Sequence, residues 1–191
     1  MRVTVVPYDP GWVTAFETER GILEPLLPAD AAIEHVGSTS VPEMPAKPII
    51  DIAIGLSERS SLDEACSAII ASGRYVHFRF LERWRPERRY LVSLRDRAER
   101  SRWPDVIDDA DWSNEMPLDL RLCQVHLLRR GSEMLEELIG LRELLIREPD
   151  ARKAYAETKL ALSSEKWRSS REYAIRKDAI IEQLRREGGL G

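Results

Sequence analysis

The spacing of apolar residues predicts alternating strands and helices over most of the chain. Alternating or continuous apolar runs predict strands over residues 2–6, 31–36, 49–54, 75–80, 89–94 and 119–128. A first helix is predicted with Asp9 as its N-cap and Pro10 at its first helical position, and it is expected to reach about Pro28. A second helix is predicted after the capping box at residues 61–64. This order predicts a mixed α/β fold.

The last third of the chain carries apolar residues at helical spacing. They predict helices that begin near Ser132 and Pro149, and a final helix around Tyr173. We therefore expect an α/β domain over residues 1–130 and a C-terminal helical subdomain, residues 131–191, packed on it. Residues 95–117 have alternating charges and no clear period, which predicts a long loop of the kind that often serves as a functional lid.

Length and composition fit a soluble domain with a helical extension. The 191 residues are 43% hydrophobic and 32% charged, a mixture that can bury a core. No apolar run approaches the ~20 residues that span a bilayer, and the N-terminus lacks an export signal, so we expect a cytoplasmic protein without membrane partners. The net charge of −4 argues against a nucleic-acid partner. Cys66 and Cys123 lie in apolar surroundings and are predicted to be buried thiols.

The segment around residues 35–52 is the most unusual part of the sequence. A predicted strand ends in Gly37-Ser38-Thr39-Ser40, and the next strand carries Asp51 among isoleucines. Backbone amides and hydroxyls after a strand can bind phosphate oxygens, and an acid inside an apolar strand is costly without a partner or a cation. Together these residues could hold a nucleoside triphosphate with its Mg²⁺. They fit equally well a glycine-serine turn followed by an acid at a strand end.

Three N-terminal motifs carry a resemblance to a known family. They are Tyr8-Asp9-Pro10-x-Trp12-x3-Phe16-x2-Glu19, His35-Val36-Gly37-Ser38-Thr39-Ser40-Val41-Pro42 and Ala46-Lys47-Pro48-Ile49-Ile50-Asp51-Ile52. Together they resemble the GrpB family, and weaker matches extend the resemblance over most of the chain. GrpB-like proteins occur alone or fused to dephospho-CoA kinase, and their reaction is generally unassigned. The resemblance implies an α/β nucleotidyltransferase-like mixed sheet with helices.

In that superfamily, a Gly-Ser turn precedes an acid-x-acid pair on the next strand. The matching residues are Gly37, Ser38 and Asp51, but Ala53 stands where the second acid is usual. The resemblance implies that Ser38 contacts a phosphate and that Asp51 binds the metal. A two-metal site would have to recruit Glu34, Asp119 or a residue of the long loop. The alternative is a single Mg²⁺ that arrives with the nucleotide.

A histidine on the last predicted strand is a second candidate. Family members typically carry His-x-His there, whereas this chain has Gln124 and His126. The two alternate and therefore share a face of the sheet. If Asp51 lies on that face, His126 could contact phosphate, bind metal or act as a base. A hydrogen-bonded structural histidine is the alternative.

Basic residues supply further candidates for nucleotide binding. Lys47 could neutralise phosphate charge, and Arg88 and Arg89 form a pair suited to a triphosphate or a carboxylate. Lys159 and Lys177 each follow a tyrosine by four residues on a predicted helix. Each lysine also fits an ordinary role on an exposed loop or at the rim of a helix. The acidic run at residues 108–111 lacks an EF-hand pattern and is expected to be a solvated loop.

These candidates favour an enzyme that uses Mg²⁺ and a nucleoside triphosphate, with ATP the expected nucleotide. The expected reaction is nucleotidyl transfer to a small-molecule acceptor, with Asp51 and His126 in the catalytic roles. Two alternatives remain open: ATP-dependent activation of a carboxylate or amide for condensation or cyclisation, and a non-catalytic nucleotide-binding module. The sequence does not indicate the acceptor, the preferred base or the oligomeric state.

Overall fold

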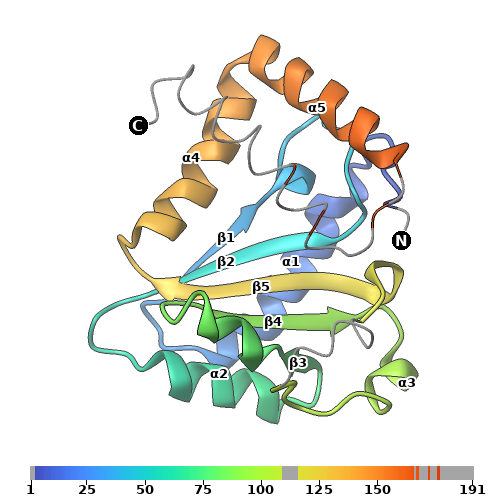
Figure 1. Cartoon of the computed structure of the whole chain (residues 1–191). Helices are drawn as coiled ribbons and strands as arrows, with labels where there is room; N and C mark the ends of the chain where they lie inside the picture. The colour runs from blue at the N-terminus through green and yellow to red at the C-terminus, as the bar shows by residue number, and fades with distance from the viewer. Residues whose placement is uncertain (1–2, 109–115, 166, 168–171, 173–175, 177–191) are drawn as a thin grey trace.

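A mixed β-sheet forms the centre of the molecule (Figure 1). The computed structural model describes residues 3–108, 116–165, 167, 172 and 176. Within them, the sheet has the strand order β1-β2-β5-β4-β3. Its strands are β1 (Ala32–Val36), β2 (Ile50–Leu56), β3 (Tyr75–His77), β4 (Arg89–Leu94) and β5 (Arg121–Arg129). The β2–β5 pair is parallel and the other neighbours are antiparallel, which confirms the mixed α/β fold expected from the sequence.

Two helices cover one face of this sheet. Helix α1 (Gly11–Leu23) and helix α2 (Leu62–Ala71) bury their apolar sides on the isoleucine-rich face of β2 and the facing residues of β5. Helix α2 begins as predicted, because the Glu64 amide donates to Ser61 Oγ at 3.2 Å. Helix α1 begins one residue later than predicted, with Pro10 rather than Asp9 at its N-cap, and the Gly11 amide donates to Asp9 Oδ1 at 2.8 Å. Such side-chain bonds satisfy amides that the first helical turn leaves without partners.

A buried carboxylate ties α1 to this core. Glu19 is 1% exposed and accepts hydrogen bonds from the Tyr75 hydroxyl at 2.6 Å and from Arg74 Nη2 at 3.3 Å. Cys66 and Cys123 are buried on the same side of the sheet, as predicted, and burial raises the pKa of the Cys66 thiol to about 12. Glu19 in the first family motif therefore has a structural role.

The opposite face is covered at its two ends. Helix α4 (Glu133–Arg147) packs Leu135 on Val36, Ala53 and Leu128, at the β1–β2 end. A Cβ on Gly55 would lie 2.8 Å from Leu135 Cδ2, so the bare glycine lets α4 approach the sheet closely.

Helix α5 (Pro149–Ser163) follows α4 and packs Tyr155 on Val41 and Met44, just after the serine-rich turn. At the other end of the face, a second apolar cluster lies over β3 and β4. Its buried members are Val76, Phe78, Phe80, Tyr90, Val92, Leu94 and Met116.

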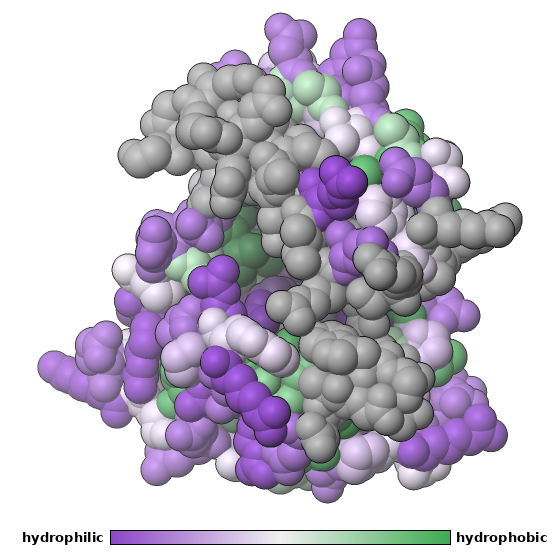
Figure 2. All heavy atoms as spheres, in the orientation of Figure 1, coloured by the Kyte–Doolittle hydropathy of each residue, from purple (hydrophilic) through white to green (hydrophobic). Residues whose placement is uncertain are grey.

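The middle of this face is less covered. Along β5, half-buried Gln124 and His126 alternate with the buried residues Cys123, Val125 and Leu127. Figure 2 shows this side of the molecule, and its surface is hollowed near the middle, below the part formed by α4 and α5. No helix in the described ranges is long and apolar enough to cross a membrane.

Three predicted elements differ from the structure. Residues 2–6 were expected to form a strand, but within the described part Val6 forms only an isolated bridge with Ala46. The predicted strand 75–80 ends at His77, because Phe78 leaves extended geometry and a 3₁₀ turn, Arg79–Arg83, follows. The predicted loop 95–117 contains the short helix α3 (Arg97–Arg100) and a bridge from Val106 to His77. The helix expected around Tyr173 lies outside the described residues.

Candidate functional site

The serine-rich turn begins at a glycine whose conformation other residues rarely adopt. Strand β1 ends at Val36, and Gly37 follows with φ 72° and ψ −171°. That region of backbone space is essentially restricted to glycine. The chain then enters a 3₁₀ turn, Ser38–Ser40, in which Ser40 Oγ donates to the Gly37 carbonyl at 2.6 Å. The bend therefore depends on Gly37 and is held by Ser40.

A neutral histidine anchors the middle of this turn. Thr39 is buried, and its Oγ1 lies 3.0 Å from His35 Nε2. The His35 ring stacks on Phe16 with a centroid distance of 4.7 Å and an interplanar angle of 9°. Burial and the nearby Arg142 cation lower the pKa of His35 to about 4. His35 is therefore neutral at physiological pH, and it fixes Thr39 inside the fold.

Ser38 is the hydroxyl of this turn that remains available to a ligand. It is half-buried, and its side chain has no hydrogen-bond partner among the described residues. The first backbone bond of the turn is donated by the Ser40 amide, to the Gly37 carbonyl at 3.3 Å. The amides of Ser38 and Thr39 come earlier in the chain and have no carbonyl partner within the turn, as expected for the first amides of a helical turn. These two amides and one hydroxyl form a set of donors.

The Asp51 carboxylate packs directly against this turn. Asp51 of β2 is the register partner of Val36, which precedes Gly37. A Cβ added to Gly37 would lie 3.0 Å from both Cβ and Cγ of Asp51 and nearer still to Oδ2. Real Cβ atoms essentially never come as close to another atom as this one would to Oδ2, and the contacts with Cβ and Cγ would also be unusually tight. The absence of a side chain at Gly37 therefore gives the half-buried carboxylate its place beside the donors of the turn.

His126 lies on the same face of the sheet as Asp51. The parallel register pairs Asp51 with Gln124 and Ala53 with His126. His126 is also the register partner of Tyr90, and the two rings meet edge-on with centroids 5.3 Å apart. The geometric condition for a shared site is met, since side chains at paired positions point to one side of the sheet.

Neither Glu34 nor Asp119 is shown to complete a second metal position beside Asp51 among the described residues. Glu34 is the register partner of Ala53, but its Oε2 accepts a hydrogen bond from Arg142 Nη1 at 2.8 Å. Asp119 lies in a 3₁₀ turn before β5 begins. The described residues contain no group of three or more His, Cys, Asp or Glu side chains arranged to hold a metal. Asp51 is therefore the oxygen ligand that β2 offers.

Known proteins identify the family of this chain. A family model described as "GrpB protein" matches residues 2–187. The chain belongs to the GrpB family. A UPF0157 protein of Streptomyces coelicolor is 26% identical to it over 190 residues, which are 99% of this chain and 86% of that protein. A UPF0157 protein of Halalkalibacterium halodurans is 27% identical over 188 residues, which are 95% and 80% of the two chains.

Solved structures include a GrpB protein with the same fold. The crystal structure of GrpB from Enterococcus faecalis matches with a TM-score of 0.72 at 26% identity, over 97% of this chain and 96% of that one. The Cid1 poly(U) polymerase bound to MgGTP overlaps with a TM-score of 0.45 at 13% identity, over 80% of this chain and 44% of that one. The family resemblance of the sequence motifs is thus confirmed.

The arginine pair of this GrpB protein is divided between the two faces of the sheet. Arg88 continues the alternation of Tyr90 and points to the Asp51 face, where its Nη1 lies 3.4 Å from His126 Nδ1. Arg89 points to the helix side, where it pairs with Asp63 at 2.6 Å and Glu82 at 3.5 Å. The two arginines therefore do not meet one ligand together.

The predicted lysines lie at different depths of the GrpB fold. Lys159 of α5 is buried, and its Nζ donates to the Pro45 carbonyl at 2.8 Å. Lys47 is half-buried and lies two residues beyond Pro45, on the segment that leads into β2. Lys159 thus holds α5 on the segment beside Lys47. Lys177 lies outside the described residues, as do Asp109 and Asp111 of the acidic run.

Tyr90 is a site residue that the sequence interpretation missed. Burial, together with the negative charge of Asp51, raises the pKa of its phenol, and the Arg121 cation acts against this shift. Tyr90 therefore lies within electrostatic range of Asp51. The available signal was the two-residue spacing of Arg88, just before β4, and Tyr90 on β4, which sends both side chains to one face.

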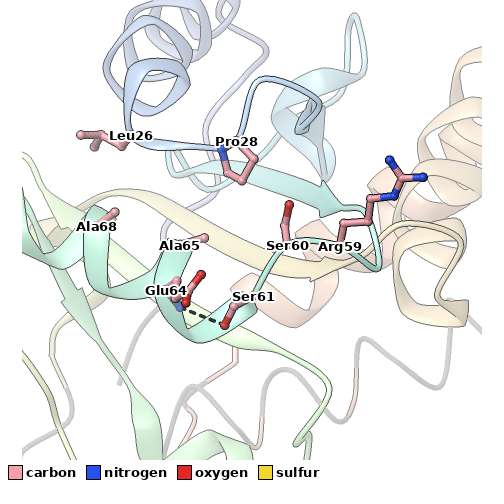
Figure 3. Close-up of a pocket in the computed structure, with 8 residues that line it drawn as sticks. All are labelled: Leu26, Pro28, Arg59, Ser60, Ser61, Glu64, Ala65 and Ala68. Atoms are coloured by element: carbon pink, nitrogen blue, oxygen red, sulfur yellow. Dashed lines mark hydrogen bonds between the residues drawn. The ribbon is translucent and has the colours of Figure 1, made fainter.

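A separate hollow opens on the helix side of this GrpB chain (Figure 3). Its volume is about 300 Å³, and it lies where the end of α1 meets the start of α2. The lining residues are Leu26, Pro28, Arg59, Ser60, Ser61, Glu64, Ala65 and Ala68. The Ser61 hydroxyl in its lining already accepts a hydrogen bond from the Glu64 amide, and α2 packs on the face of the sheet opposite Asp51. This hollow is therefore distinct from the site around Asp51.

Proposed function

We propose that this protein binds a nucleoside triphosphate together with one Mg²⁺ at the Gly37–Asp51 corner, and transfers a nucleotidyl group to a small acceptor. The observation that carries the proposal is the packing of the Asp51 carboxylate against Gly37, at the start of the serine-rich turn. This places a cation ligand and a set of phosphate donors side by side. ATP is the nucleotide we expect.

The residues of the corner have complementary roles toward such a ligand. The Ser38 hydroxyl and the amides of Ser38 and Thr39 would donate to phosphate oxygens, as backbone nests do. Asp51 would supply one oxygen to Mg²⁺, an ion that proteins commonly hold with one or two carboxylates plus the phosphates of the substrate. Bound Mg²⁺ would neutralise charge on the phosphates.

The proposed transfer is an in-line displacement at the α-phosphorus. A nucleophilic oxygen or nitrogen of the acceptor forms a bond to that phosphorus, while the bond to the bridging oxygen of the β-phosphate breaks. Pyrophosphate leaves with the electron pair, and the proton of the acceptor passes to solvent water. The acceptor would approach from the Asp51 face of the sheet.

A non-catalytic nucleotide-binding module is the second candidate. It is favoured by Ala53 and by the pairing of Glu34 with Arg142, which leave Asp51 without a second carboxylate on the neighbouring strand. Two-metal transfer requires several oxygen ligands, whereas binding with one Mg²⁺ does not. Mass spectrometry of products separates the candidates, because only transfer yields pyrophosphate and a nucleotidylated acceptor.

A thermal-shift titration tests the binding that both candidates share. At 100 times its dissociation constant, ATP with Mg²⁺ should stabilise the folded chain by about 2.7 kcal/mol. Asp51→Asn should abolish the Mg²⁺-dependent part, since the amide carries no negative charge. Asp63→Asn is the matched control, because Asp63 lies on the opposite face beside Arg89. Equal Mg²⁺-dependent stabilisation of wild type and a folded Asp51→Asn variant would refute the proposal.

A further inference from the structure

A half-buried arginine meets one nitrogen of the candidate histidine. Arg88 Nη1 lies 3.4 Å from His126 Nδ1, and the guanidinium lies over the Tyr90 ring at 5.0 Å from its centroid. The Arg88 Nε is enclosed and has no hydrogen-bond partner among the described residues. Tyr90 also holds the histidine ring edge-on, at 5.3 Å. The guanidinium and the imidazole are therefore both fixed by the same aromatic ring.

The chemistry of the two groups determines which one donates. A guanidinium has five N–H donors and no acceptor, and it stays protonated in proteins. In a hydrogen bond between Arg88 and His126, Nδ1 must therefore accept through its lone pair. An imidazole whose Nδ1 accepts and that remains neutral carries its proton on Nε2. A second proton on the ring would place two cations side by side.

We propose that Arg88 fixes His126 as the neutral tautomer with the proton on Nε2. In this tautomer Nε2 of His126 is a hydrogen-bond donor, and the Nδ1 lone pair that a general base would need is occupied by Arg88. The group that Nε2 recognises is an anionic oxygen, such as a phosphoryl oxygen. This last step rests on the proposed function, whereas the tautomer does not. Arg88 is accordingly a positioning residue that acts through His126.

Nitrogen NMR of the ligand-free protein tests the tautomer directly. The chain has three histidines, so a protein labelled with ¹⁵N-histidine gives a spectrum that single His→Gln variants assign. His77 is an internal reference: burial lowers its pKa, and its Nε2 lies 2.7 Å from Glu82 Oε1, an acceptor. We expect His126 to show the same Nε2–H pattern as His77 near neutral pH. A proton on Nδ1, or on both nitrogens, would overturn the proposal.

Two variants separate the Arg88 contact from general packing. Arg88→Met should release His126 into a mixture of tautomers, because the donor to Nδ1 is lost. Tyr90→Phe is the control: it keeps the ring beside His126 and should leave the Nε2–H pattern unchanged. Melting temperatures of both variants verify that they fold. An unchanged His126 spectrum in folded Arg88→Met would show that Arg88 does not set the tautomer.

Affinity for ATP with Mg²⁺ tests the donor role. His126→Gln retains an N–H donor near the position of Nε2 and should bind ATP within a few-fold of wild type. His126→Leu should lose about tenfold or more, the typical effect of deleting a hydrogen bond to a charged group. Equal affinity of both variants, with loss of turnover alone, would indicate a base and contradict the donor role. Wild-type protein that binds no ATP would refute the proposed function and the anionic ligand, while the tautomer is decided by NMR alone.

Discussion

Replacing Gly37 by alanine should test the close contact between the turn and Asp51. The new methyl group would lie within 3.0 Å of Asp51 Cβ and Cγ, and the backbone has φ 72° and ψ −171°. Strain at such a residue costs about 1–3 kcal/mol, and overpacking adds about 1–3 kcal/mol. We therefore expect Gly37→Ala to lower the free energy of unfolding by about 2–6 kcal/mol.

Two other glycines separate these contributions. Gly73 has φ 69° and would place a Cβ in open space, so Gly73→Ala should cost only the ~1–2 kcal/mol of a left-handed residue. Gly21 lies inside α1 with nothing within 4 Å of an added Cβ, so Gly21→Ala should stabilise by about 0.5–1 kcal/mol. Urea titration with a common m-value measures all three changes. A cost at Gly37 no larger than that at Gly73 would refute the predicted clash.

A double-mutant cycle locates the clash on Asp51. Asp51→Gly removes the atoms that the new methyl group would meet, so the Gly37→Ala/Asp51→Gly variant should be more stable than the two single effects predict. The backbone strain of Gly37 remains in both variants and cancels in the cycle. Additive effects would mean that the methyl group is accommodated without moving Asp51, and the argument for a fixed corner would fail.

Three further outcomes follow from buried polar groups. The free energy of unfolding should fall as the pH drops from about 6.5 to about 4, because His35 takes up a proton in the unfolded chain more readily than in the folded one. After allowance for partial exposure of the ring, the loss is about 2 kcal/mol. Urea titrations of His35→Gln across this pH range should lack that part of the pH dependence. Arg142→Met should raise the pKa of His35 in an NMR titration, since the cation is the second cause of its depression after burial. Tyr75→Phe should cost about 1–3 kcal/mol in thermal unfolding because it removes a donor to the buried carboxylate of Glu19, and a melting temperature equal to wild type would contradict that contact.

The sequence predicted most of the helices and strands, because the apolar positions along the chain match the side chains that the fold buries. The isoleucines of β2 lie on the face that α1 and α2 cover, and α4 packs on Ala53 of the other face, so both sides of this strand are covered. The ends of elements were less predictable. Phe78 is apolar and suits a strand by composition, yet it turns the chain into a 3₁₀ segment and packs in the β3–β4 cluster. Tertiary packing decided that position against local propensity.

The candidate site was predictable in its residues but not in its contacts. Gly37, Ser38 and Asp51 stand out by residue type, but their proximity depends on the register of β1 and β2, which composition does not specify. His35 was treated only as part of a motif, and its stacking on Phe16 comes from a helix distant in sequence. The opposite directions of Arg88 and Arg89 could have been inferred from strand alternation.

The rates at which the two buried thiols react can report how often different parts of the folded chain open. Cys66 lies on α2, which packs on one face of the sheet, whereas Cys123 lies in β5, between β2 and β4. A thiol reagent can attack either sulfur only when the surrounding structure transiently opens, because the thiolate is the reactive form and burial suppresses it. If Cys66 reacts faster than Cys123, its rate reports the detachment of α2 alone. If both thiols react at the same rate, that rate reports the cooperative opening of the whole sheet.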